Sequence, residues 1–211
     1  MNLKEDYHVH CNYNDHSASD LTIKNVVKQA EKIGLQTVAF TEHVRKTSEW
    51  ISDYLEQIES IGDCELNIIP GFEAKILRDG SVDCPEQYAS RYLLIASFHT
   101  TYNDKHVWVE ALETAIRNPD VDIIGHLAPE PIFSLSVNEI TDLAHIIVQN
   151  NKTVELNAKY HRPPADWVRI FKANGVHFHL GSDAHALQEV GSFDRIADLI
   201  SIVDEGQAKI I

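Results

Sequence analysis

The chain has 211 residues, of which 44% are hydrophobic, and this length and composition predict one globular domain over residues 1–211. Neither a run of about 18 apolar residues nor a leader peptide is apparent, so we expect a cytoplasmic protein that does not cross a membrane. The formal charge of −14 argues against a long nucleic acid as partner, because gripping its phosphates requires a basic face.

Strand-like and helix-like segments alternate along the chain. Apolar, β-branched segments predict strands at 3–9, 35–40, 65–74, 92–98, 121–125, 153–157 and 176–181. Helical periodicity predicts helices at 23–33, 50–61, around 108–115, 136–147, 163–174 and 193–203. Residues 76–84 contain an Asp-Gly turn that predicts a small hairpin.

This alternation predicts a parallel sheet with helices outside it, because each parallel connection needs a crossover. Seven units in about 200 residues favour a closed β/α barrel over an open, doubly wound sheet. The open sheet is the alternative, but the sequence contains neither GxGxxG nor GxxxxGK[ST], the usual phosphate-binding loops of such sheets.

Titratable residues gather where the predicted strands end. Six of the seven strand ends supply them: His8, His10 and His16, then His43, Glu73, His99, His126, and finally Asp183 with His185. In a parallel barrel these ends and the loops after them form one face. The sequence therefore predicts a metal centre at the C-terminal ends of the strands.

The spacing and number of these residues indicate which of them should lie together and how many ions they could hold. His8 and His10 are two apart on a strand and should face the same side, and closure of the barrel should bring them near Asp183 and His185. Imidazole and carboxylate without thiolate suit Zn, Mn or Fe, and the number of ligands is sufficient for two or three ions. Glu73 is the expected bridge between them.

These residues resemble the PHP (polymerase and histidinol phosphatase) domain superfamily. The resemblance rests on HVHCNYNDH, FTEH, the GFE and SFH segments with IIGH, and LGSDAH, although TDH is commoner than TEH in the second motif. It implies a distorted seven-stranded TIM-like barrel, (β/α)7, and a stand-alone metal-dependent phosphoesterase. It also implies one metal on His8, His10, Glu73 and Asp183, a second on Glu73, His99 and His126, and a third on His16, His43 and His185.

The expected activity is hydrolysis of small phosphomonoesters, similar to that of a histidinol phosphatase. A metal-bridging hydroxide, positioned by Glu73 and Asp183, would act as nucleophile, and His161 is a candidate general acid. Arg162 ranks first among the expected substrate-binding residues, followed by Arg45 and Lys159, because all three follow strand ends. The expected partner is therefore a small phosphorylated substrate.

Three alternatives stay open at this point. An amidohydrolase-like metal enzyme acting on carbon also uses an HxH pair and a late aspartate on a barrel. A phosphodiesterase of short nucleotides would use the same metal chemistry. A non-catalytic metal-binding PHP module, like those attached to polymerases, is less compatible with a full set of nine ligand positions.

Overall fold

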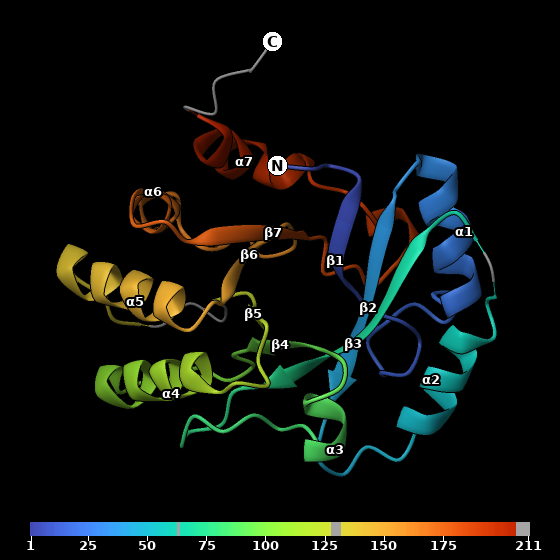
Figure 1. Ribbon diagram of the computed structural model, residues 1–211, viewed down its shortest axis with the longest axis horizontal. Helices are drawn as coiled ribbons and strands as arrows, with labels where there is room; N and C mark the ends of the chain where they lie inside the picture. The colour runs from blue at the N-terminus through green and yellow to red at the C-terminus, as the bar shows by residue number, and fades with distance from the viewer. Residues whose placement is uncertain (63, 128–131, 206–211) are drawn as a thin grey trace.

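A computed structural model of the protein describes residues 1–62, 64–127 and 132–205. Seven strands form one parallel sheet in chain order, and the sheet curls into a nearly closed barrel (Figure 1). The strands are β1 (Glu5–Val9), β2 (Thr37–Val44), β3 (Asn67–Lys75), β4 (Leu93–Ser97), β5 (Ile123–Ile124), β6 (Thr153–Asn157) and β7 (His177–Gly181). The predicted TIM-like (β/α)7 fold is confirmed.

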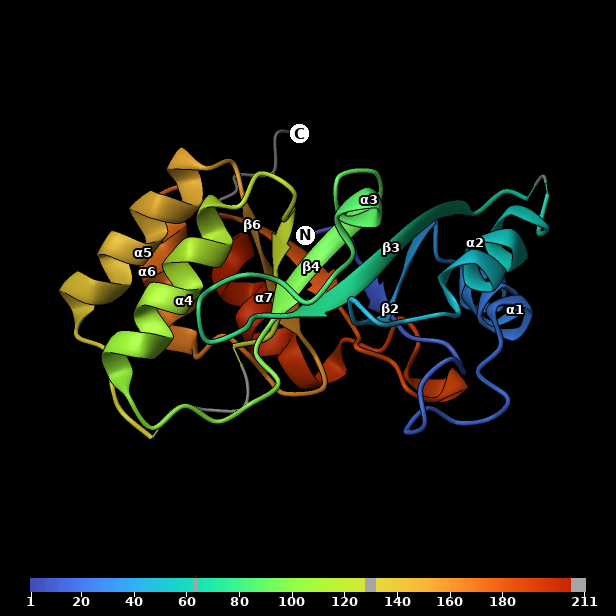
Figure 2. The same cartoon turned by 90° about the horizontal axis from the view of Figure 1, so that it is seen from below.

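Helices cover the outside of the barrel. They are α1 (Ile23–Ile33), α2 (Ile51–Glu59), α3 (Glu86–Ala89), α4 (Lys105–Arg117), α5 (Val137–Gln149), α6 (Ala165–Ala173) and α7 (Ala197–Asp204). Figure 2 shows α4, α5 and α6 grouped on one flank, with α1 and α2 on the opposite flank. Among the described residues, no helix is long and apolar enough to span a membrane.

Local sequence explains where the main helices begin and end. Thr22 caps α1 by accepting a hydrogen bond from the amide of Asn25, and Gly34 ends the helix in the left-handed conformation at φ 78°. Ser136 and Glu139 form the predicted capping box at the start of α5. These signals need only neighbouring residues, so they are readable from sequence.

Elements that depend on distant pairing depart from the prediction. β2 continues to Val44 because it pairs with β3 along its whole length, with His43 opposite Glu73 and Val44 opposite Ala74. The predicted hairpin is present as an antiparallel bridge between Ile76 and Val82. The short helix α3 and the 3-10 helix Leu187–Glu189 were not predicted. The helix predicted at 193–203 begins as a 3-10 helix, Asp194–Ile196, and continues as α7.

The barrel closes at the C-terminal ends of β1 and β7. The amide of Asp183 donates to the carbonyl of His8 at 2.8 Å, and the amide of His10 donates to the carbonyl of Ala184 at 3.1 Å. Buried Asp6 accepts from the amide of Ser182 at 3.0 Å. The seam is therefore joined where the titratable residues of both strands lie.

Candidate metal centre

Glu73 lies at the middle of the face formed by the strand ends. Its carboxylate is buried, and imidazoles from four other strand ends surround it. Oxygen Oε2 lies 3.5 Å from His8 Nε2, 3.6 Å from His10 Nε2, 2.7 Å from His43 Nδ1 and 3.3 Å from His99 Nε2, and Oε1 lies 3.0 Å from His126 Nε2. We call these six residues the Glu73 cluster.

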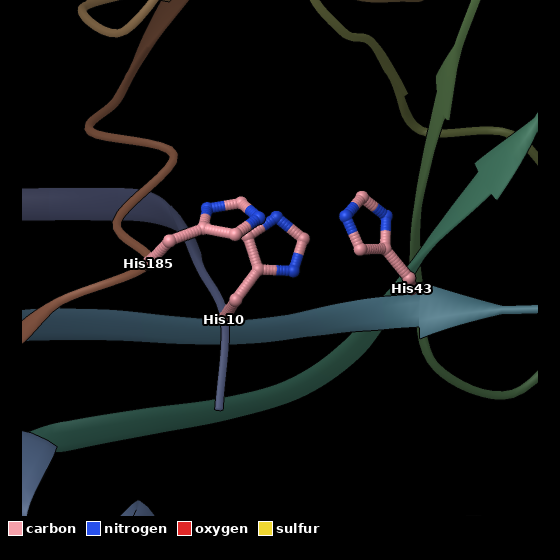
Figure 3. Close-up of side chains that lie close together, drawn as sticks. All are labelled: His10, His43 and His185. Atoms are coloured by element: carbon pink, nitrogen blue, oxygen red, sulfur yellow. The ribbon is translucent and has the colours of Figure 1, made fainter. Parts of the chain in front are cut away.

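Three overlapping groups have ligand-type atoms within 4.8 Å of one another. They are His8, His10 and Asp183; His43, Glu73 and His99; and His10, His43 and His185. Figure 3 shows the last group, with the His10 and His185 rings close together and His43 at the end of β2. The centroid of the His10 ring lies 4.2 Å from that of His43 and 4.3 Å from that of His185.

The Glu73 carboxylate has the environment expected of a metal ligand. Both oxygens are buried, and imidazole nitrogens approach them closely, His43 Nδ1 at 2.7 Å from Oε2 and His126 Nε2 at 3.0 Å from Oε1. Burial would raise the pKa of Glu73, but the imidazoles of His99, His8 and His43 outweigh it and hold the pKa well below its usual range. An ionised carboxylate amid converging nitrogen donors fits a divalent cation.

Two buried carboxylates orient the HxH pair, and neither was assigned a role from the sequence. Glu155 on β6 lies 2.7 Å from His8 Nδ1 through Oε1. Glu42 on β2 lies 3.3 Å from His10 Nδ1 and accepts from the amide of Cys11 at 2.9 Å. Each carboxylate holds one ring nitrogen and leaves the other facing the cluster, which is how neighbouring carboxylates position metal-binding histidines.

Asn157 links Glu155 to Asp183 at the seam between β1 and β7. Its Nδ2 donates to Glu155 Oε1 and to Asp183 Oδ2, each at 3.1 Å. Gly181 on β7 leaves the room that Glu155 requires, since a Cβ there would lie 1.9 Å from Glu155 Oε1. The alternation of Glu155 and Asn157 along β6, two residues apart, is the sequence signal that could have found them.

Electrostatic shifts follow from this crowding. Burial disfavours charge on His10, yet hydrogen bonds to Asp183 and Glu42 outweigh it and raise its pKa to about 9. Burial would raise the pKa of Asp183, but His8 and His10 outweigh it and hold that pKa far below its usual range. Burial and nearby His10 lower the pKa of His185 to about 3. The face therefore pairs anionic carboxylates with a mixture of charged and neutral imidazoles.

His16 is placed differently from its sequence-based grouping with His43 and His185. Its side chain is 63% exposed and its Nδ1 lies 2.8 Å from Asp15. Its ring centroid lies 5.4 Å from that of His43 and 6.0 Å from that of His185. His16 therefore lies at the edge of the centre, and a change of its side-chain rotamer could bring it closer to His43 and His185.

The expected substrate-binding residues separate into two places. Lys159 Nζ reaches the centre, at 3.3 Å from Asp183 Oδ1 and 2.8 Å from His185 Nδ1. Arg162 lines a different cavity of about 280 Å³ beside Trp108 and Trp167. Among the described residues that line this cavity, none belongs to the Glu73 cluster.

His161 also lies away from the cluster. Its Nε2 is 2.8 Å from Asp198 Oδ1 on α7. Its backbone has a positive φ of 54°, an uncommon conformation for a residue other than glycine. The side chain thus contacts the outer helix, and this placement gives no support to a role as general acid.

A second cavity, of about 550 Å³, opens onto the cluster. We call it the chamber; Glu73, His43, His16, Arg45, Trp50 and Lys75 are among the residues that line it. Arg45 was predicted to face the substrate, whereas Lys75 was missed. The sequence contained a signal for Lys75, because it follows Glu73 by two positions and so lies on the same face of β3.

Comparisons with known proteins agree with this geometry. The family model described as PHP domain matches residues 6–180. A probable phosphatase of Acetivibrio thermocellus is 30% identical over 97% of this chain and 88% of its own length. A probable phosphatase of Vibrio campbellii is 30% identical over the whole of this chain and 89% of its own. The DNA polymerase/3'-5' exonuclease PolX of Bacillus subtilis is 29% identical, and the match covers 88% of this chain but only 35% of that protein.

Solved structures show the same fold. A candidate histidinol phosphatase of Listeria monocytogenes superposes with a TM-score of 0.69 at 15% identity, covering 89% of this chain and 97% of that one. A chain in the structure of archaeal ribonuclease P with mature tRNA matches with a TM-score of 0.57 at 13% identity, over 95% of this chain and 90% of that one. At these identities the likeness concerns the barrel alone.

Proposed function

The chain belongs to the PHP domain family, and from this premise we propose that it is a metal-dependent phosphomonoesterase of small phosphorylated molecules. Activity as a phosphoester hydrolase is supported by the family and by phosphatase-named relatives that match almost the whole chain. The observation that carries the metal dependence is the Glu73 carboxylate, buried among five imidazoles whose nitrogens lie 2.7 to 3.6 Å from its oxygens.

The proposed ligands are the nine residues singled out from the sequence. They would hold two or three ions of Zn, Mn or Fe through His8, His10, His16, His43, Glu73, His99, His126, Asp183 and His185. When bound, such ions supply positive charge and lower the pKa of a water molecule towards neutrality. Glu73 and Asp183, at the centre and at the seam, are the carboxylates placed to orient that water.

The protein's own residues would prepare the site for a phosphate. Glu155 and Glu42 hold His8 and His10 in place through Nδ1, so the rings need no reorganisation when substrate arrives. Lys159 carries a positive charge beside Asp183 and His185 and can contact an oxygen of the phosphate. It replaces Arg162 as the favoured phosphate-binding residue among those expected from sequence.

A small substrate is favoured over a long nucleic acid. The net charge of −14 opposes a polyanion, and the chamber of about 550 Å³ has the size of a small-molecule site. The match to PolX covers about a third of that polymerase, so its activities are not carried over. L-Histidinol phosphate is a reasonable first substrate because of the fold shared with the Listeria protein.

The proposal is tested by metal analysis and a substrate panel. Purified protein should contain Zn, Mn or Fe and should release phosphate from at least one sugar, amino-alcohol or nucleotide monoester. A chelator should abolish the release, and adding back one of these metals should restore it. Hydrolysis of an amide or lactone with no phosphate release from any ester would instead support the amidohydrolase-like alternative and overturn the proposal.

A further inference from the structure

Two cationic residues stand side by side at the mouth of the chamber. β2 and β3 pair with His43 opposite Glu73 and Val44 opposite Ala74. The next residue after each strand pair is therefore Arg45 on the β2 side and Lys75 on the β3 side. Both line the chamber together with His43 and Glu73. The cations therefore form an outer layer directly above two residues of the Glu73 cluster.

Among the described residues, Arg45 and Lys75 form no ion pair, although Asp83 and Asp15 belong to nearby loops. The Asp83 carboxylate accepts a hydrogen bond from the amide of Lys46 at 2.9 Å, and Asp15 pairs with His16. Like charges on adjacent strands disfavour each other, so an anion between them would relieve that repulsion.

The spacing separates this pair from the proposed catalytic centre. Two residues along a strand advance the chain by about 6.6 Å, so Lys75 lies one layer outward from Glu73. A phosphate at the Glu73 cluster would leave the outer layer to another part of the same molecule. The aromatic rings of Trp50 and Tyr13, with centroids 5.3 Å apart, also line the chamber and give it an apolar surface.

We propose that Arg45 and Lys75 form a subsite for a second anionic group of the substrate. The preferred substrates are then phosphomonoesters that also carry a carboxylate or a second phosphate, joined to the scissile phosphate by a short spacer. This inference rests on the proposed phosphomonoesterase activity and names the class of substrate. Arg45 supplies a planar fork suited to either anion, and Lys75 supplies a point charge.

Matched substrates test the subsite. 3-Phosphoglycerate and glycerol 3-phosphate differ by a carboxylate, and ribulose 1,5-bisphosphate and ribulose 5-phosphate differ by a phosphate. The measured quantity is the ratio of kcat/KM within each pair. Wild type should prefer the doubly anionic member, and Lys75→Met or Arg45→Met should reduce that preference on the order of tenfold, mainly through KM. The two pairs show which second anion is favoured.

Lys46→Met provides the matched control for charge. Lys46 follows Arg45 directly but does not line the chamber, so its removal changes the net charge without touching the subsite. It should leave the ratio unchanged within about twofold. A fall in the ratio equal to that of Lys75→Met would mean that the general field of the protein, and not a subsite, sets the preference.

Other outcomes overturn the inference while leaving the proposed function intact. If Lys75→Met and Arg45→Met lower kcat/KM equally for both members of a pair, the two cations contact the scissile phosphate. If kcat/KM is unchanged for both members, the two cations do not contribute to substrate binding. Calorimetry of 3-phosphoglycerate with metal-free protein gives an independent reading: Lys75→Met should weaken this binding on the order of tenfold. If wild type cleaves no ester yet shows this Lys75-dependent binding, the proposed function fails and the subsite stands.

Discussion

β1 and β7 each carry a His-x-His pair, but the two pairs lie at opposite ends of neighbouring strands. His8 and His10 are fully buried at the end of β1, among the carboxylates of the candidate metal centre. His177 and His179 begin β7, where His177 is exposed and the ring of His179 packs on Tyr7 with centroids 4.1 Å apart. The same spacing therefore gives a candidate metal site at one end and surface packing at the other.

Carboxylates account for the difference. Burial disfavours charge on both His8 and His179. At His8, Glu155, Glu73 and Asp183 outweigh the burial and raise the pKa well above its usual value. At His179, burial dominates and lowers the pKa, although Glu5 partly opposes it. A histidine pair becomes a candidate ligand only where closure of the barrel surrounds it with acceptors.

Removing each pair should have the largest and most unequal effect. The double variant His8→Ala/His10→Ala should lose bound metal and more than about a hundredfold in kcat/KM, because it deletes two proposed ligands. His177→Ala/His179→Ala should keep metal content and rate within about twofold, since surface substitutions have small effects. Metal analysis and phosphate release measure both, and equal loss in the two variants would contradict the assignment.

Removing the supporting carboxylates should give an intermediate effect. Glu155→Gln keeps the volume but replaces the charge beside His8 Nδ1, so metal affinity should fall about 10- to 100-fold. Glu5→Gln is the matched control, because it removes the carboxylate near His179. Titration with a competing chelator measures the affinity. Thermal unfolding of the metal-free proteins separates positioning from folding: a large drop in Tm with unchanged affinity would make Glu155 merely structural.

Titration of the metal-free protein should distinguish the two pairs by the opposite directions of their pKa shifts. The pKa of His10 is raised to about 9, whereas that of His179 is lowered below its usual value. Protonation of His10 stabilises the metal-free fold below about pH 6.5, and this contribution is lost as the pH rises through about 9. Because metal requires the neutral ring, affinity should rise by about tenfold per pH unit over this range.

Imidazole proton resonances followed against pH provide the measurement. The His10 signals should move near pH 9 and those of His179 below pH 6.5. A metal affinity that stays constant between pH 6.5 and 9 would contradict the expected competition between protons and metal. Identical midpoints for the two histidines would remove the electrostatic distinction between the pairs.

The fold was predictable in proportion to how local its signals are. The prediction of β6 at 153–157 matches the structure, and the cap of α5 at Ser136 was read from four residues. The prediction of β2 ended four residues too early, at 40 and not at Val44, because the extension depends on pairing with β3. The candidate site divides in the same way: the candidate ligands at strand ends were found, whereas the supporting roles of Glu42 and Glu155 were not predicted.

The missed residues have a common physical reason. Glu155 is adjacent to His8 only after the barrel places β6, β7 and β1 next to one another, and 147 positions separate the two in sequence. Arg162 and His161 follow a strand end as expected, yet the loop turns their side chains towards the outer helices. Side-chain direction in a loop depends on what packs against it, and sequence spacing does not contain that information.

By itself the sequence determined the alternation of seven strands with helices and the face on which titratable residues gather, because periodicity and strand polarity are local properties. Only the tertiary structure decided that Glu73 is the common neighbour of five histidines, that the two His-x-His pairs have different environments, and that Arg45 and Lys75 stand together without an acidic partner among the described residues. These are outcomes of strand register and of closure between β1 and β7, which join residues from the two ends of the chain.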